Sequence, residues 1–236
     1  MKIDVLTLFP EMYNGVVEAS ILKRAIEDNK VQISIHNIRD FSKNKHHRVD
    51  DYPIGGGEGM VLMIEPIYDA IMHYKQEDTL VVMMTPQGKQ YSQQMAYDLA
   101  KYKHIIILCG HYEGFDERIR SLVDLEISIG DYILTGGEIP SMVLIDSITR
   151  LVEGVISEDS HKNDSFNNNL LDYPVYTKPI EFMGMKVPDI LLSGHHENIN
   201  KWRREQQIIK TKMRRPDLLE KSGKCEQELY SSKETK

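Results

Sequence analysis

Three near-continuous apolar segments, each running straight into a glycine-containing loop, constrain the fold of this chain more than any other feature. The segments are 79–84, 104–109 and 125–134, and the loops after them are 85–88, 110–114 and 135–138. Helical patterns at Gln93–Tyr102 and Pro140–Val152 follow the first and third segments. Buried strands that alternate with helices predict an α/β fold with a mostly parallel sheet covered on both faces.

The amino-terminal part continues the same alternation. Ile3–Phe9 is an apolar run, Val16–Ile26 carries a helical apolar stripe, and Val31–Ile35 alternates with period two. A further helix is expected at Pro66–Tyr74, where proline suits the first helical position. Because Asp4 interrupts the first run and no small-residue cleavage site follows, a first strand is favoured over a signal peptide.

The pattern changes after residue 157. Residues 158–169 are polar and rich in Asp, Ser and Asn, which indicates a flexible linker. Beyond them, Asn198–Arg215 and Asp217–Lys221 have helical patterns. We therefore expect a larger domain at 1–157 and a small helical domain at 170–236.

The charge is divided unevenly between these parts. The chain has 29 Lys and Arg against 36 Asp and Glu, and 29 − 36 gives −7, which excludes a uniformly basic nucleic-acid binder. From Ser193 to Lys236 there are 11 basic and 7 acidic residues, net +4, so the remainder carries −11. Lys201–Arg215 alone holds seven basic residues and one acidic residue. This asymmetry predicts an acidic body with a basic contact surface.

Several familiar classes of protein are not indicated. No apolar run approaches the ~18–20 residues of a membrane span, so no membrane partner is expected. Cys109 and Cys225 cannot form a disulfide framework, which favours the cytoplasm, with Cys109 as a buried, reduced thiol. The pairs His46-His47 and His195-His196 are adjacent rather than four residues apart, and no Cys-x-x-Cys occurs, so no metal site is predicted.

The three glycine loops are the first candidate for a binding site. Open α/β sheets bind ligands at the carboxyl ends of their strands, where glycine lets the backbone approach closely; the alternative is that these glycines only make tight turns. No P-loop, no G-x-G-x-x-G that opens a helix and no G-x-S-x-G occurs. The ligand therefore need not be a polyphosphate, and a cofactor with an adenine, a ribose and a zwitterionic end would suit these loops.

Two single residues have a functional and a structural interpretation. Asp164, in the polar linker, is either a turn or N-cap residue or a carboxylate brought to a site when the loop orders on substrate. Arg150, at the end of the helical stretch 140–152, is either its electrostatic partner or an arginine favoured by the helix dipole.

The strings CGHYEGFDERI (109–119) and SIGDYILTGGEIP (128–140) resemble the bacterial tRNA (guanine-N1)-methyltransferases of TrmD type. The resemblance covers nearly the whole chain, in order and with compatible spacing. It includes KIDVLTLFPEM (2–12), GGGEGM (55–60), TPQG (85–88), LIDSITRLVEGV (144–155), DSFNNNLLDYPVYTKP (164–179), VPDILLSGHHENINKWR (187–203) and RRPDLL (214–219).

The resemblance implies a SPOUT-type α/β fold with a deep trefoil knot, a small all-helical C-terminal domain and a homodimer. It implies methyl transfer from S-adenosylmethionine to N1 of guanine 37 in tRNA, with Asp164 as general base and Arg150 as catalytic arginine. Residues of the basic helix would meet tRNA: Lys201, Arg203, Arg204, Arg214 and Arg215. The implied cofactor-binding residues are Thr85, Pro86, Gly110, Tyr112, Glu113, Gly114, Ile129, Gly130, Asp131, Tyr132, Ile133, Leu134, Gly136, Gly137 and Pro140.

Some positions depart from the family's usual pattern. These are Glu58 for Pro, Ile64 for Lys, Asn169 for Gly, Val175 for His, Lys178 for Arg and His195 for Asn. They concern the linker and RNA contacts and leave Asp164 and Arg150 in place. Two alternatives stay open: a SPOUT methyltransferase acting on another RNA site, and an RNA-binding protein without enzymatic activity. Mg²⁺ is a further candidate cofactor, for which we identify no ligand set.

Overall fold

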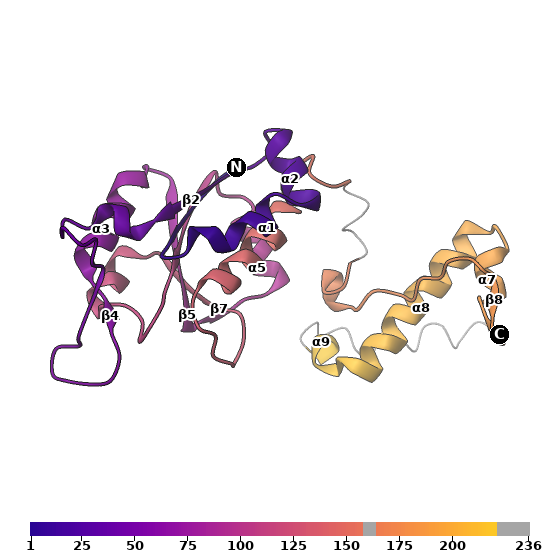
Figure 1. Cartoon of the computed structure of the whole chain (residues 1–236). Helices are drawn as coiled ribbons and strands as arrows, with labels where there is room; N and C mark the ends of the chain where they lie inside the picture. The colour runs from indigo at the N-terminus through magenta and orange to yellow at the C-terminus, as the bar shows by residue number, and fades with distance from the viewer. Residues whose placement is uncertain (158–163, 221–236) are drawn as a thin grey trace. The chain divides into compact units, whose positions relative to one another are not determined.

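A computed structural model describes residues 1–157 and 164–220 of the chain. The chain divides into two compact units, Met1–Ser157 and Glu158–Lys236, and each is considered by itself (Figure 1). Part of the predicted linker, residues 158–163, lies outside the described residues, as do Lys221 and Cys225.

A five-stranded sheet forms the centre of the first unit. Its strands are β1 (Lys2–Thr7), β2 (Gln32–Asn37), β5 (Thr79–Gln90), β6 (His104–Cys109) and β7 (Leu125–Ser128). They run in the order β2-β1-β6-β5-β7, and every neighbouring pair is parallel. The prediction of an α/β fold with a mostly parallel sheet is therefore confirmed.

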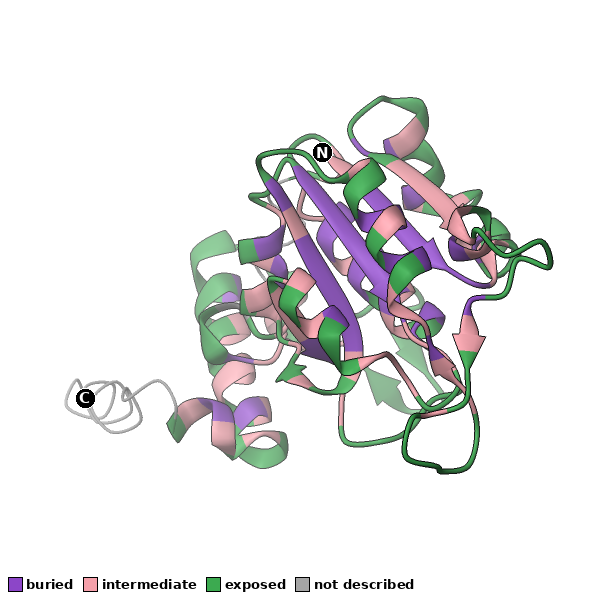
Figure 2. Ribbon diagram, turned by 90° about the vertical axis from the view of Figure 1, so that its left-hand side faces the viewer, coloured by how far each residue is buried: buried purple, intermediate pink, exposed green. Residues whose placement is uncertain are grey.

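Alternate side chains of the strands point into two hydrophobic cores, one on each face of the sheet. In β6, Ile105 and Ile107 face one core, whereas Ile106 and Leu108 face the other. Figure 2 shows this sheet as a band of buried residues under its covering helices. The first core, which contains Ile105, is covered by α1 (Asn14–Val17), α2 (Ser20–Glu27), α4 (Gln93–Leu99), α5 (Glu138–Thr149) and the 3-10 helix η1 (Pro10–Tyr13). The second core, which contains Ile106, is covered by α3 (Ile64–Tyr74) and the 3-10 helices η2 (Ile38–Phe41) and η3 (Glu117–Leu122).

Three predicted elements differ from the observed ones. The helical stripe at 16–26 is broken into α1 and α2, since Ala19 is extended and Ser20 has a φ of 52°. The predicted strand at 125–134 ends at Ser128, and the rest of it is a loop. Strand β5 is longer than predicted because Met84 and Lys89 both pair with Ile127, so that the four residues between them form a bulge in a strand that continues to Gln90.

The second unit is mainly helical. It contains α7 (Asp189–Leu192), α8 (His196–Arg214), α9 (Pro216–Glu220) and the 3-10 turn η4 (Asn167–Asn169). The expectation of an all-helical domain needs one correction, a hairpin of β8 (Glu181–Phe182) and β9 (Met185–Lys186). Its two-residue loop has positive φ at Met183 and Gly184, the combination that a tight hairpin turn requires.

A short antiparallel pair, β3 (Asp50–Asp51) and β4 (Val61–Leu62), flanks the glycine cluster at 55–59 in the first unit. No helix within the described ranges is both long enough and apolar enough to cross a membrane.

Candidate functional site

A cavity of about 460 Å³ lies at the carboxyl ends of β6 and β7 and beside the bulge of β5. All predicted cofactor-binding residues except Asp131 line it: Thr85, Pro86, Gly110, Tyr112, Glu113, Gly114, Ile129, Gly130, Tyr132, Ile133, Leu134, Gly136, Gly137 and Pro140. The structure thus brings the three glycine loops together, as expected for neighbouring parallel strands.

Further lining residues were not predicted. They are Met83, Met84, Gln87, His111, Phe115, Asp116, Glu117, Arg120, Ile127, Ser128 and Thr135. Most are immediate neighbours of predicted residues, and only the fold shows which side chains turn inward. Arg120 belongs to no motif, so no sequence signal could have identified it.

Gly137 is required where two loops cross at the cavity. Its N–H donates to the carbonyl of Gly110 at 2.8 Å. A Cβ at this position would lie 2.7 Å from the Cα of Cys109 and 2.8 Å from the N of Gly110. Since both are backbone atoms that cannot swing away, only glycine allows this approach, which explains the second glycine of the Gly136-Gly137 pair.

The bulge of β5 forms a second wall and depends on Gly88. A Cβ there would lie 2.5 Å from the backbone of Glu126 and Ile127 on β7. Next to this close contact, Thr85–Gln87 leave the pairing with β7, and Lys89 returns to it. The loop thereby exposes backbone groups that the ladder would otherwise use.

The turn after β6 carries strained backbone. Tyr112 has a φ of 59°, in the left-handed region that a non-glycine residue adopts at a cost of about 1–3 kcal/mol. The end of the glycine cluster holds this turn in place. Glu113 N–H donates to the Met60 carbonyl at 3.0 Å, and Leu62 N–H donates to the Gly114 carbonyl at 2.9 Å. The GGGEGM motif therefore supports the cavity without lining it.

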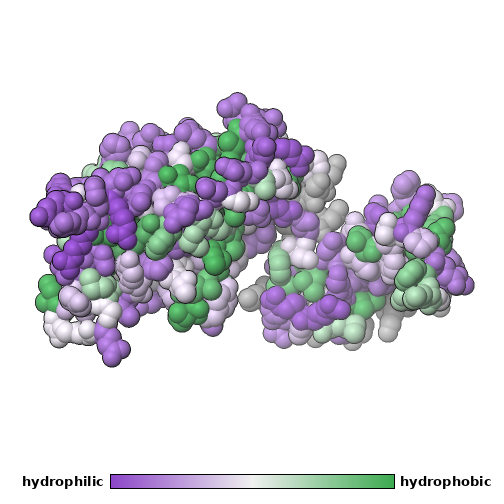
Figure 3. Space-filling model, viewed as in Figure 1, coloured by the Kyte–Doolittle hydropathy of each residue, from purple (hydrophilic) through white to green (hydrophobic). Residues whose placement is uncertain are grey.

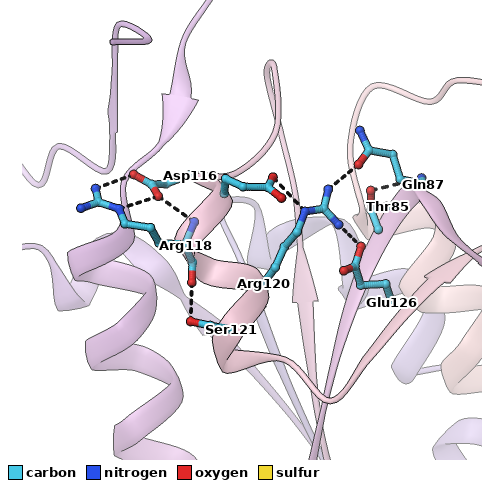
Figure 4. Close-up of polar contacts among 8 residues, drawn as sticks. Thr85, Gln87, Asp116, Arg118, Arg120, Ser121 and Glu126 are labelled. Carbon is cyan, nitrogen blue, oxygen red and sulfur yellow. Dashed lines mark hydrogen bonds and ion pairs between the residues drawn. The ribbon is translucent and has the colours of Figure 1, made fainter.

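Arg120 on η3 joins the two strands that border the bulge. Figure 4 shows its guanidinium between Gln87 of β5 and Glu126 of β7, donating a hydrogen bond to each. It also donates to Glu117 at 2.9 Å. These bonds, first of all the one with Glu126, raise the pKa of Arg120. The arginine is thus held by acceptors from this chain.

The remaining charges of the lining are acidic. Among the described residues that line the cavity, Arg120 is the only lysine or arginine, whereas Glu113, Asp116 and Glu117 are carboxylates. Asp116 accepts two side-chain bonds from Arg118, at 2.9 and 2.7 Å, and these hold the pKa of its carboxyl below the usual range (Figure 4). The cavity therefore favours a ligand that carries positive charge.

Next to the lining residues Gly110 and Gly137, the adjacent residues Cys109 and Glu138 belong to a buried polar layer. Glu138, 2% exposed, accepts a hydrogen bond from Thr7 at 2.7 Å. The thiol of Cys109 lies 3.3 Å from the hydroxyl of Tyr13, and burial raises its pKa to about 12. Cys109 is thus buried and protonated, as predicted for a structural thiol. His111 lines the cavity, and its buried Nδ1 has no hydrogen-bond partner among the described residues.

The two predicted catalytic residues are not among the described residues that line the cavity. Arg150 is the C-cap of α5 and is not among the residues that line the cavity. Asp164 belongs to the second unit. The structure therefore does not join these residues to the cavity within one unit, and their roles stay a prediction.

The predicted RNA-binding residues divide into two groups. Arg203 stacks over the ring of Tyr173 at 4.8 Å, and Arg215 pairs with Asp217 at 2.7 Å, so both contact residues of their own unit. Lys201, Arg204 and Arg214 are exposed along α8, and Lys201 also pairs with Glu197 at 3.1 Å. Within the described ranges, no group of three or more His, Cys, Asp or Glu side chains could hold a metal ion.

Comparisons with known proteins show the family of this chain. A sequence profile of the family described as tRNA (guanine-1)-methyltransferase TrmD matches residues 1–221. A tRNA (guanine-N(1)-)-methyltransferase of Mycoplasma mycoides is 54% identical over 233 residues, which are 98% of this chain and 97% of that one. A protein of the same name from Staphylococcus aureus strain JH9 is 57% identical over 224 residues, 94% of this chain and 91% of its own. With a matching profile and relatives of this similarity over almost their full lengths, the chain belongs to the TrmD family of tRNA (guanine-1)-methyltransferases.

Proposed function

We propose that this protein transfers a methyl group from S-adenosylmethionine to N1 of guanine 37 in tRNA, in the cytoplasm. The observation that carries the proposal is the cavity at the carboxyl edge of the sheet. Its walls are loops whose glycines bring bare backbone together, in a chain that belongs to a family of tRNA methyltransferases.

The cavity suits S-adenosylmethionine in size and charge. Its volume of about 460 Å³ falls within the range of about 300–1,000 Å³ for small-molecule sites. Backbone N–H and C=O groups of the loops can bind an adenine and a ribose, and Glu113, Asp116 and Glu117 favour the positive charge. When bound, S-adenosylmethionine supplies a methyl group that its sulfonium already activates.

Asp164 and Arg150 supply the chemistry on the RNA side of this proposal. Guanine N1 carries a proton and is a poor nucleophile until that proton leaves. A carboxylate within hydrogen-bond reach removes it, a contribution of ~10²–10⁴ in rate, and this is the role we assign to Asp164. The negative charge then spreads to O6 of the guanine, where the guanidinium of Arg150 stabilises it. The loops have to hold N1 in line with the methyl group.

The distance along α5 supports a homodimer. Pro140 lines the cavity, whereas Arg150 lies roughly 15 Å further along the helix axis, at about 1.5 Å per residue. An arginine side chain is much shorter than that. We therefore propose that the Arg150 that serves one cavity comes from a second copy of the chain.

Exposed apolar residues offer a surface for this second copy. Ile139 and Val143 on α5 are 49% and 40% exposed, and Ile133 in the loop before the helix is 79% exposed. Figure 3 shows hydrophobic residues at the surface in the part of the first unit where α5 and this loop lie in Figure 1. Apolar side chains gathered beside a cavity are typical of protein interfaces.

The exposed basic residues of α8, Lys201, Arg204 and Arg214, are the proposed contacts for tRNA phosphates. They would orient the RNA without reading its sequence. The net +4 of the carboxyl-terminal part gives this surface its sign within an acidic chain.

The deciding experiment is methyl transfer to tRNA with the modified position mapped. We expect one labelled methyl group per tRNA, at N1 of guanine 37, and no transfer when another base replaces guanine 37. Asp164→Ala should keep the affinity for S-adenosylmethionine and slow transfer by about 10²- to 10⁴-fold. Labelling at a different nucleotide would replace the proposed substrate by another RNA site. Binding of tRNA with no transfer by a folded, wild-type protein would favour an RNA-binding protein without enzymatic activity.

Mixed protomers test the shared site. Equal amounts of Arg150→Ala and Gly137→Val chains, each inactive alone, should recover about a quarter of the wild-type activity, since half of the dimers would contain one intact site of two. No recovery after verified subunit exchange would place both residues in one protomer's site.

A further inference from the structure

The segment that begins at Asp164 is fixed to the helices of the second unit. Ser165 accepts a hydrogen bond from the N–H of Asp172 at 3.0 Å. The N–H of Phe166 donates to the carbonyl of Leu170 at 2.6 Å, and Leu170 is buried. A closed turn therefore follows Asp164 immediately, instead of an open loop.

Helix α8 holds the far side of this turn with its own side chains. The hydroxyl of Thr211, itself buried, accepts the N–H of Leu171 at 2.8 Å. The ammonium of Lys210 donates to the carbonyl of Asp172 at 2.9 Å. Both contacts come from one turn of the helix, so the segment after residue 170 has a defined place on α8.

Arg215 contacts the near side of the turn, at Phe166. Its guanidinium lies over the ring of Phe166, 5.8 Å from the ring centre. The same guanidinium donates to both carboxylate oxygens of Asp217, at 2.8 and 2.7 Å. Asp217, in the first turn of α9, thus fixes the plane of the arginine, and the arginine covers the ring.

The backbone of the turn needs such support. Phe166, Asn168 and Asn169 have φ values of 75°, 52° and 56°, all in the left-handed region that non-glycine residues seldom adopt. Strain of this kind persists only where surrounding contacts determine the conformation. Without the contacts of Arg215 and α8, the turn would relax and the direction of the chain at Asp164 would change.

We propose that Arg215 is a positioning residue for methyl transfer: it holds the Ser165–Leu170 turn, and thereby the carboxylate of Asp164, in the orientation that removes the proton from guanine N1. The inference rests on the proposed function of Asp164. It assigns Arg215 to the chain's own turn rather than to tRNA phosphates, and leaves that second role to its neighbour Arg214, which is exposed at the end of α8.

The adjacent arginines provide a matched pair of variants. For Arg215→Ala we expect kcat to fall by about 10- to 100-fold, the cost of a misplaced catalytic group, with little change in the affinities for tRNA and S-adenosylmethionine. For Arg214→Ala we expect weaker tRNA binding and a salt dependence reduced by about one ion. A wild-type kcat in Arg215→Ala, or a loss confined to tRNA affinity, would overturn the proposal.

A double variant separates positioning from general damage to the fold. If Arg215 acts through Asp164, Asp164→Ala/Arg215→Ala should be no slower than Asp164→Ala alone. If the double variant instead lost kcat by the product of the two single losses, Arg215 would not act through Asp164. Variants of Phe166 test the same contact even if Arg215→Ala unfolds. Phe166→Tyr keeps an aromatic ring under the guanidinium and should keep kcat, whereas Phe166→Leu removes the ring and should lower kcat. Equal kcat values for these two variants would also contradict the proposal. An inactive wild type would refute the proposed function itself, whereas an active wild type with an unaffected Arg215→Ala refutes only this inference.

Discussion

The two ends of the central sheet solve the problem of buried polar groups in opposite ways. Near the amino ends of β1, β5 and β6, side chains satisfy one another around Asp4, which is 1% exposed. At the carboxyl ends, glycines bring bare backbone together around a cavity, and Tyr112 keeps a strained φ. The first end can support only structure, while the second leaves groups for a ligand.

The Asp4 network, defined as Lys2, Asp4, His36, Thr79 and His104, is complete in itself. Asp4 bonds His36 at 2.8 Å, His104 at 2.7 Å and Lys2 at 2.7 Å. The hydroxyl of Thr79 accepts the N–H of Gln76 and lies 2.7 Å from Nδ1 of His104. This hydroxyl can donate to Nδ1, which assigns the ring hydrogen to Nε2, facing Asp4. A network satisfied in this way stabilises the fold and has no capacity left for a substrate.

The largest effect is expected from Asp4→Ala. Removing a buried carboxylate leaves His104 and His36 without their partner, and we expect a loss of about 3 kcal/mol in the free energy of unfolding. The cofactor affinity of the folded protein should not change, because the network lies away from the cavity. Urea unfolding and calorimetric titration measure the two quantities, and Asp98→Ala, which removes an exposed carboxylate paired with Lys101, is the matched control. If Asp4→Ala weakened the affinity for S-adenosylmethionine and left the free energy of unfolding unchanged, our assignment of the amino ends to stability and the carboxyl ends to binding would be wrong.

A smaller, opposite effect is expected from Gly137→Ala. The new Cβ would meet the backbone of Cys109 and Gly110, so the crossing of the loops has to widen. We expect the affinity for S-adenosylmethionine to fall by at least about tenfold, equivalent to 1.4 kcal/mol. The same substitution at Gly15, where a Cβ would meet nothing within 4 Å, should leave the affinity unchanged. Equal affinities in the two variants would show that the crossing does not shape the site.

The smallest effect concerns the pH dependence of stability. Burial alone would raise the pKa of Asp4, but its bonds with Lys2, His36 and His104 outweigh burial and hold the pKa below the ordinary 3.8. A lowered pKa means that this stabilisation is present above pH 3.8 and is lost as the pH falls through the folded value.

Tyr74 stacks on His36, and Lys2, His36 and His104 are the titratable groups that bond Asp4. In acid titrations of the free energy of unfolding, Asp4→Asn should therefore have a shallower slope below pH 4 than the wild type. Parallel curves would mean that Asp4 does not titrate in this way.

Much of the carboxyl end could be predicted from the sequence. The apolar run His104–Cys109 predicts β6 to the residue, and the glycine loops predict where the cavity lies. Both follow from local rules, since a buried strand is a continuous apolar run and parallel strands place their ends together. The return of β5 to the sheet at Lys89 could not be predicted, because its polar residues do not follow the apolar pattern of a buried strand.

The second unit shows where sequence patterns lose their power. The run of basic residues along α8 predicts a basic helix, and the helix is there. The pattern does not distinguish Arg215, which holds Phe166 and Asp217, from Arg214, which is exposed. That difference depends on which segment of the chain folds back onto the helix. Charge counts therefore locate a surface, but tertiary contacts decide which of its side chains are free to bind another molecule.

Hydrogen exchange with and without S-adenosylmethionine tests the central claim most directly, because it reports on both ends of the sheet at once. We expect slower exchange on binding at the amides of the non-proline residues in 85–90, 110–116 and 128–140, and no change at Lys2–Asp4, Thr79 or His104. Protection at the amino ends alone, or none at the three glycine loops despite saturating cofactor, would contradict the assignment of the cavity as the cofactor site.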